Sequence, residues 1–455
     1  MSFLFYNEID NLRKLNNLGI NNFDMKLVGG KHTMNGEQLL IRFTNENFQK
    51  KMYAIAENVY VFTGFGNSNA TAVIGKSSVI LIDALDCDRY AKNLRKELSK
   101  ITPKPVRTII YTHTCPDHTG GAGVFSDTVQ EVIAFAKARE DLKYYDRLEN
   151  ILNMRKIFAR GYGLSDEDAI THGLGPREGF IKAGASQVPL EPTTLYTGKS
   201  VEREIDGVKF KLISMPGETK DSISVLLPEY NVLAVGDNYS NVFPNMYSVR
   251  GSSYRDVANW IEILDQILAL DAETILPGHT WPLLGKEEAR RSIQNYRDVL
   301  EYVLFETLRC MNDGLTLNET AEAVKLPERF KTKSLGEYFS LVEWAVKAIY
   351  TGYLGWFDGQ AANLIPVPQE EYRQTMLELI GEENLRRKIK ACVMQEQYQM
   401  ALQLNMILHD PVLEKAALEG RAAEVANANA RHFYLARAKE LYTTDHSQDV
   451  NGFLI

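Results

Sequence analysis

Residues 106–121 read VRTIIYTHTCPDHTGG, an apolar run that leads directly into a cluster of polar residues. The apolar, β-branched run over 106–111 predicts a buried strand, and the text after it predicts a short loop. That loop places two imidazoles, a thiol and a carboxylate within six residues, from His113, Cys115, Asp117 and His118. All four are side-chain types that ligate metal ions, so the strand ends in a candidate metal site.

Three further strand ends carry groups of the same kind. Glu218 follows KLIS in MPGET, Asp237 follows VLAV in VGDN, and His279 follows ETIL in LPGHT. Taken alone, each of these residues reads as a turn residue or a helix cap. Three of the chain's eight histidines stand at such strand ends, beside acidic residues and glycines, and this joint pattern favours a metal site. The remaining histidines are expected to be surface, loop or core groups: His32, His172, His409, His432 and His446.

The residues before and after the quoted stretch predict alternating strands and helices. Residues 52–85 read as short strands with a hairpin turn at 75–77. The segment DRYAKNLRKELSKI at 88–101 spaces its apolar residues at helical intervals, so strand, helix and strand form a crossover unit. We expect residues 127–160 to be largely helical and residues 161–200 to be irregular.

Strand patterns return after residue 200. VEREI and VKFKLI flank Asp206-Gly207, a strong hairpin signal, and SISVLLP and NVLAVGD continue the sheet. From about residue 285 to about residue 443 the sequence has an amphipathic helical pattern, which a loop interrupts at 355–369. The predicted domains are therefore an α/β domain over 1–300, a helical domain over 301–443 and a tail over 444–455.

Composition narrows the class of protein. Apolar residues make up 45% and charged residues 24% of the 455, which is typical of a globular protein. Lys and Arg number 51 against 59 Asp and Glu, a net charge of -8, and no basic block occurs, which disfavours nucleic acid as a partner. The four cysteines lie far apart without a CxxC pair, so neither a disulfide scaffold nor a zinc finger is expected.

The sequence also predicts where the protein resides. Glu8 and Asp10 stand where a secretory signal would carry positive charge, so we expect a cytoplasmic protein. No stretch approaches about 18 consecutive apolar residues, so no membrane span is expected.

The sequence resembles the metallo-β-lactamase superfamily, whose HxHxDH, PGH, GD and GH motifs are matched in order by THTCPDH, PGE, GD and GH. NSNATAVIGKSSVILIDAL looks like that superfamily's first hairpin. Within it, the chain is similar to the alkyl sulfatases. YTGYLGWFDGQAANLIP and NARHFYLARAKEL are close to signature stretches of their dimerisation domain, and FPNMYSVRGSSYRDVANW resembles the segment that reaches the sulfate. The resemblance covers roughly residues 50–443 and implies an αββα α/β fold followed by an all-α dimerisation domain.

The resemblance also implies a two-metal site. One ion would be held by His113, Cys115 and Glu218, the second by Asp117, His118 and His279, and Asp237 would bridge them. Two Zn²⁺ per chain are the expected cofactor, because nitrogen, oxygen and sulfur donors with open positions suit zinc. Asp117 and Asp237 would be the catalytic carboxylates. Arg250 and Tyr353 would bind the sulfate, although an arginine in a loop and a tyrosine in an aromatic cluster are commonly structural.

Two departures from the family pattern leave alternatives open. Cys115 replaces the second His of HxHxDH, and its thiolate either completes the first metal site or points away and leaves that site weaker. The sterol-carrier-like domain that alkyl sulfatases use beside apolar substrates is not expected within 455 residues, which leaves a long-chain substrate in question.

The function expected is a metal-dependent hydrolase that cleaves a small anionic alkyl sulfate to alcohol and sulfate, working as a homodimer. One alternative is a hydrolase of another ester, thioester or lactone, and another is a degenerate, non-catalytic binding or scaffold protein. A two-iron redox protein is less favoured. That class normally adds a flavin domain, and the sequence after residue 300 lacks the strand-helix alternation that such a domain needs.

Overall fold

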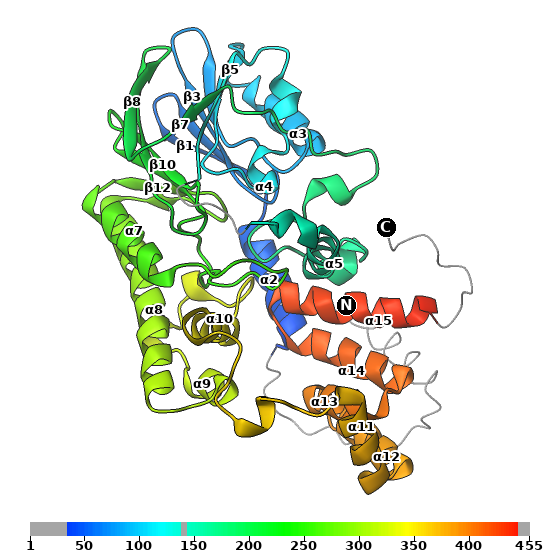
Figure 1. Ribbon diagram of the computed structural model, residues 1–455. Coiled ribbons are helices and arrows are strands. Elements are labelled where there is room, and N and C mark those ends of the chain that lie inside the picture. Colours follow the sequence, from blue (N-terminus) through cyan, green and yellow to red (C-terminus); the bar gives the residue numbers. More distant parts are fainter. Residues whose placement is uncertain (1–33, 138–142, 445–455) are drawn as a thin grey trace. The chain divides into compact units, whose positions relative to one another are not determined.

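The computed structural model describes residues 34–137 and 143–444 (Figure 1). Asn35 begins a compact unit that contains every element described below. Glu8, Asp10, His32 and His446, for which we stated expectations from the sequence, lie outside the described ranges. The predicted tail beyond residue 444 lies outside them as well.

The first sheet has seven strands in sequence order. They are β1 (Lys51–Ala56), β2 (Val59–Thr63), β3 (Ala70–Ile74), β4 (Val79–Ile82), β5 (Val106–Ile110), β6 (Glu131–Phe135) and β7 (Thr194–Tyr196). Strands β1 to β4 are antiparallel hairpins, whereas β4 to β7 run parallel. The antiparallel pairing of β3 with β4 confirms the predicted hairpin at 75–77. Helix α3 (Asp88–Leu98) connects the parallel strands β4 and β5, which confirms the predicted crossover unit.

The expectation of a largely helical segment over 127–160 is wrong in its first part. Residues 131–135 form β6, which pairs with β5 and β7, and helix α5 (Glu149–Arg160) begins only later. The five-residue run EVIAF is apolar and mostly buried, and a run this short does not distinguish a buried strand from a helix by periodicity. Its place between two parallel strands decides its conformation.

The second sheet has six strands in the order β13-β12-β11-β10-β9-β8. They are β8 (Ser200–Ile205), β9 (Val208–Ser214), β10 (Ile223–Leu227), β11 (Val232–Gly236), β12 (Thr274–Pro277) and β13 (Leu283–Leu284). Asp206 and Gly207 join β8 to β9 with φ of 48° and 83°, the left-handed conformations of a tight hairpin turn. This turn confirms the expectation drawn from VEREI-DG-VKFKLI.

The two sheets pack face to face, with helices on both outer faces. Val61, Ile80 and Ile110 of the first sheet share one core with Phe210 and Val225 of the second. Helix α3 covers the outer face of the first sheet. Helices α7 (Val257–Ala269) and α8 (Lys286–Asn312) cover the outer face of the second. The result is the αββα arrangement expected from the resemblance.

Helices alone follow β13 in the described part of the chain. They are α8, α9 (Leu317–Ala323), α10 (Val342–Leu354), α11 (Gln369–Ile380), α12 (Glu382–Met394), α13 (Tyr398–Leu408), α14 (Pro411–Glu424) and α15 (Ala428–Thr444). Helix α8 runs through the predicted boundary at residue 300, so the α/β and helical regions share a continuous helix. None of the helices in the described ranges is long and apolar enough to span a bilayer.

The C-terminal helix packs beside the sheet domain near the strand ends. On α15, His432 lies 2.8 Å from the carbonyl oxygen of Ala159 on α5 and 2.9 Å from that of Ala169 on α6 (Asp166–Ala169). Arg431 of the same helix pairs with Glu37 of α2 (Gly36–Asn47) at 3.2 Å. The contact of His432 with Ala159 holds the C-terminal end of α5, where Arg160 lies.

Candidate metal centre

Four chain segments bring their polar side chains together at one edge of the two sheets. His113 follows β5, and Asp117 and His118 belong to the short helix α4 (Pro116–Thr119). Asp237 and His279 follow the parallel strands β11 and β12. Gly278 permits the last approach, because a Cβ atom there would lie 2.5 Å from Asp237 Oδ1 and 2.8 Å from His118 Cε1.

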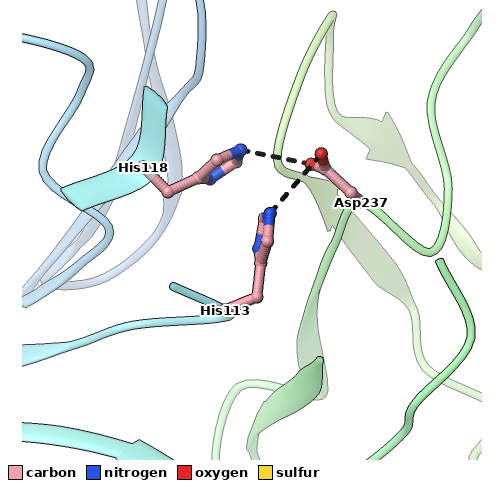
Figure 2. A group of neighbouring side chains, drawn as sticks. All are labelled: His113, His118 and Asp237. Carbon is pink, nitrogen blue, oxygen red and sulfur yellow. Dashed lines mark ion pairs between the residues drawn. The ribbon is translucent and has the colours of Figure 1, made fainter. Parts of the chain in front are cut away.

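Two overlapping groups of possible ligand atoms result. His113, His118 and Asp237 form the first group, and Asp117, His118 and His279 form the second. Within each group the ligand atoms lie within 4.8 Å of one another. Figure 2 shows the rings of His113 and His118 pointing at the Asp237 carboxylate, at 3.6 Å and 3.3 Å.

Asp237 lies between the two groups. Its Oδ2 atom is 3.4 Å from His279 Nε2, which is also 3.4 Å from Asp117 Oδ2. The Nε2 atoms of His118 and His279 face each other at 3.3 Å. A carboxylate in this position is suited to contact cations on both of its sides.

The charges of the cluster are strongly coupled. Burial acts to lower the pKa of His118, but the carboxylates of Asp237, Asp83 and Asp117 outweigh it and raise this pKa well above its usual value. Burial acts to raise the pKa of Asp237, but His279, His118 and His113 hold it well below the usual range. The carboxylates therefore stay ionised and attract positive charge.

The donor set fits a divalent metal ion. Among the residues that the structure describes, neither His113 Nε2 nor Asp237 Oδ1 has a hydrogen-bond partner, and both atoms are buried. Buried polar atoms without a partner are costly in a folded protein, and metal ligation would satisfy both. Imidazole and carboxylate together are ligands that zinc accepts. The remaining described histidines, His172, His409 and His432, belong to neither group.

Three supporting residues were not predicted from the sequence. Asp83 Oδ2 lies 2.9 Å from His118 Nδ1, and the same carboxylate accepts from the Thr112 backbone and hydroxyl at 2.8 Å each. Asn67 holds His279 through its carbonyl oxygen, 2.8 Å from Nδ1, and donates to Asp117 Oδ2 at 3.2 Å. Asp86 accepts from the Asn67 backbone at 3.2 Å, and burial raises its pKa to about 7.

A sequence signal existed for only one of the three. Asp83 ends the strand SVILIDA, so the strand-end pattern that identified Asp237 applies to it equally. Asn67 and Asp86 lie in loops without a recognisable motif.

Cys115 and Glu218 lie near the cluster but belong to neither group. Cys115 precedes α4, is partly buried and lines the same cavity as Asp117 and Asp237. Burial acts to lower the pKa of His113, but Cys115 and Asp237 outweigh this effect and raise it to about 10. The Glu218 carboxylate pairs with Arg255. The metal-ligand roles of Cys115 and Glu218 remain predictions.

Comparisons with known proteins place the chain in a family. Residues 63–279 match the metallo-β-lactamase superfamily, and residues 316–444 match the family described as alkyl sulfatase dimerisation. A linear primary-alkylsulfatase of Pseudomonas sp. is 32% identical over 80% of this chain and 72% of its own length. The chain belongs to the alkylsulfatase family. The resemblance seen in its motifs is thereby confirmed, as is its place among the hydrolases of the metallo-β-lactamase fold.

Two further comparisons agree. The alkyl/aryl-sulfatase BDS1 of Saccharomyces cerevisiae is 30% identical over 72% of this chain, which spans only 53% of the yeast protein. A structure of a double mutant of the sec-alkyl sulfatase PisA1 superimposes with a TM-score of 0.78 and 26% identity, covering 89% of this chain and 67% of that one. The chain thus spans between about half and three quarters of these relatives.

A small cavity in this alkylsulfatase-family chain lies against the cluster. Its volume is about 30 Å³, and Asp117, Asp237 and His279 line it. Three arginines line it as well: Arg160, Arg250 and Arg255. Only Arg250 was predicted from the sequence. Tyr353 does not line this cavity; it lies on α10 with 49% of its surface exposed, and its ring meets that of Tyr254 edge-on at 6.2 Å.

The three arginines differ in their partners. Arg255 pairs with Glu218, and Arg160 lies 3.6 Å from Glu178, which also accepts from the Tyr162 hydroxyl. No ion pair or hydrogen bond involves Arg250 within the described ranges. Burial and the nearby charge of Arg160 lower the pKa of Arg250, as expected for a cation without an adjoining anion.

Proposed function

We propose that the chain is a metal-dependent sulfatase that hydrolyses an organic sulfate ester to an alcohol and sulfate. The observation that carries this proposal is the unpaired Arg250 guanidinium in the cavity that contains Asp117, Asp237 and His279. A guanidinium offers forked donors to two oxygens of an anion, which matches a sulfate group beside a hydrolytic centre.

The proposed metal ligands are those the structure brings together, with Cys115 and Glu218 at the margin. His113 and Asp237 would hold one ion, and Asp117 and His279 would hold the other. His118, which belongs to both groups, would complete one of the two sites, and Asp237 could also contact the second ion. Two zinc ions bound there would supply an activated water at neutral pH and neutralise developing negative charge. Zinc, its stoichiometry of two per chain and the homodimer are all part of this proposal.

The chain's own residues would orient the ester. Arg250 would bind two sulfate oxygens, and Arg160 would add positive charge to the same cavity wall while Glu178 holds its side chain in place. Asp83 and Asn67 would keep the rings of His118 and His279 in the orientation and tautomer that ligation requires. The variant Arg250→Lys would keep the positive charge but lose the paired N–H donors of the guanidinium.

The test is sulfate release by the full-length, zinc-loaded protein from a medium-chain alkyl sulfate, followed by ion chromatography. The proposal predicts turnover that chelation abolishes and zinc restores, with kcat/KM at least about tenfold lower in Arg250→Lys. Arg290→Lys is a matched control, because this side chain is 66% exposed on α8.

Other outcomes would identify the rival functions. Turnover of thioesters or lactones without any sulfate release would overturn the sulfatase proposal in favour of another hydrolase on the same centre. Fewer than about one tightly bound metal per chain, with no turnover of any ester, would favour a binding or scaffold protein.

A further inference from the structure

A second cavity adjoins the proposed sulfate site and would receive the organic part of the ester. Its volume is about 450 Å³, and it shares Cys115, Glu218, Arg250 and Arg255 with the small cavity at the cluster. A substrate whose sulfate contacts Arg250 must therefore extend along this wall. The chemistry of the wall determines which organic groups fit.

The wall combines apolar and polar surface. Among all its lining residues, only Pro116, Leu152 and Pro216 have purely aliphatic side chains. Each methylene of an alkyl chain gains about 0.8 kcal/mol only when it is buried against apolar groups. An alkyl chain would gain part of this here, so apolar contact alone does not determine which organic group the cavity binds.

Basic residues outnumber acidic ones on this wall. Five of its lining residues are Lys or Arg and three are Asp or Glu. The acids have partners in the protein: Glu218 pairs with Arg255, Asp221 accepts from the Thr114 backbone at 2.8 Å, and Asp256 accepts from the Asn259 backbone at 3.1 Å. The basic residues are partly paired as well: Arg255 contacts Glu218, and neither Lys137 nor Lys220 is without a partner, which leaves Lys156 and Arg250.

Lys156 is the basic group best placed to bind a ligand. It projects from α5, on the same cavity wall as Arg250, and its ammonium lies 6.0 Å from the centre of the Phe180 ring. In the described ranges, Lys156 has neither an ion pair nor a hydrogen bond, and the same holds for Arg250. Burial lowers the pKa of Lys156; the charge of Glu178 opposes this effect, whereas the charges of Arg160 and Arg250 add to it. An anion between these cations would relieve their repulsion.

We propose that the substrate is a sulfate ester whose alcohol carries a second anionic group, such as a carboxylate, and that Lys156 binds this group. The inference rests on the proposed sulfatase function, because Arg250 is assigned to the sulfate. Two cations on one cavity wall then match two anions on one molecule. A competing interpretation is that the methylene stems of the lysines cover a plain alkyl chain.

The experiment compares matched pairs of esters on the zinc-loaded, full-length protein. Each pair consists of an n-alkyl sulfate and the ω-carboxyalkyl sulfate of the same length, over about four to eight carbons. We expect kcat/KM to favour the carboxylate by at least about tenfold at the best length, and Lys156→Met to reduce that ratio by about tenfold. Lys209→Met on β9, where the side chain is 65% exposed, should leave the ratio unchanged.

Binding of non-hydrolysable sulfonates separates this inference from the proposed function. Calorimetry with the ω-carboxyalkyl sulfonate and the plain alkyl sulfonate needs no turnover. Tighter binding of the carboxylate, lost in Lys156→Met, supports the anion site even if no sulfate ester is hydrolysed. Equal or tighter binding of the plain sulfonate, or an equal loss of both in Lys156→Met, overturns the inference while sulfate release still decides the sulfatase proposal.

Discussion

The Nδ1 atom of His118 lies 2.9 Å from Oδ2 of Asp83, and this contact determines which ring nitrogen faces the cluster. With Nδ1 directed at the carboxylate, Nε2 lies 3.3 Å from both Asp237 Oδ1 and His279 Nε2. A carboxylate behind a histidine ligand is the usual means of fixing ring orientation and tautomer in metal sites. Because His118 belongs to both groups, its orientation affects the whole centre.

Asp83→Asn should weaken metal binding by about 10- to 100-fold while leaving the protein folded. The amide keeps the shape of the side chain but removes the charge behind His118. Metal affinity measured by competition with a chelator tests this. Asp127→Asn is the control, since its carboxylate is exposed and pairs only with Arg95. Unchanged affinity in Asp83→Asn would show that the contact does not position a ligand.

Asp237→Ala should abolish hydrolysis and lower the metal content. This carboxylate contacts the three clustered histidines at 3.3 to 3.6 Å, and no neighbouring side chain can replace it. Elemental analysis together with sulfate release gives the result. A variant that keeps near-native activity and two metals would refute the bridging assignment.

Much of the fold could be predicted, because its patterns are local. Asp206-Gly207 identifies a hairpin by its turn chemistry alone, and the spacing in 88–101 identifies α3. The strand β6 could not be identified in this way, since its conformation depends on pairing with β5 and β7. Tertiary pairing is not visible in a five-residue apolar run.

The candidate site was predictable to the extent that strand ends converge. His113, Asp117, His118, Asp237 and His279 are brought together as their positions after strands indicate. The pairing of Glu218 with Arg255 was not predictable, because it depends on a loop 37 residues further along the chain. Arg160 reaches the cavity from the end of α5, far from any motif.

Cys115→His restores the usual ligand of the HxHxDH motif. Because the Cys115 sulfur lies outside both groups while the residue lines the cavity, the new imidazole should add metal occupancy and raise activity. If the thiolate does ligate zinc, the exchange of one donor for another should change affinity only moderately. Zinc titration of the two proteins distinguishes these versions, and complete loss of folded protein would contradict both.

Asp206 joins the two sheets through their turns and should make stability depend on pH. Hydrogen bonds from Ser77 and Ser78, at 2.8 Å and 2.6 Å to their backbone nitrogens, outweigh the effect of burial and lower its pKa to about 2. Since the folded pKa lies below the unfolded value, the stabilisation is present above pH 3.8 and is lost as pH falls toward 2.

Asp206→Asn preserves the turn, because Asn tolerates the left-handed conformation. It should cost about 1 kcal/mol at pH 7 and progressively less below pH 4. Urea unfolding between pH 3 and pH 7 measures this difference. A cost that does not vary with pH would show that the carboxylate charge is not responsible.

The helical region carries apolar side chains that the single chain leaves exposed, and we expect them to join two chains. Trp356, Ile365, Leu379 and Met394 are 74%, 89%, 77% and 69% exposed, and all lie within the region that matches the alkyl sulfatase dimerisation family. Exposed apolar surface of this kind is commonly buried in a twofold dimer. Light scattering should give twice the chain mass of 51.5 kDa.

Charged substitutions locate the interface within the full-length protein. Ile365→Glu and Leu379→Glu replace exposed residues, so they should fold normally but shift the protein toward the mass of one chain. Leu195→Glu is the matched control, because it is 59% exposed on β7, outside the helical region, and should not change the mass. If the helical region of one chain reached over a pocket in such a dimer, this would explain the exposure of Tyr353. A wild-type protein that stays at one chain mass across a wide range of concentrations would rule out this role for residues 315–443.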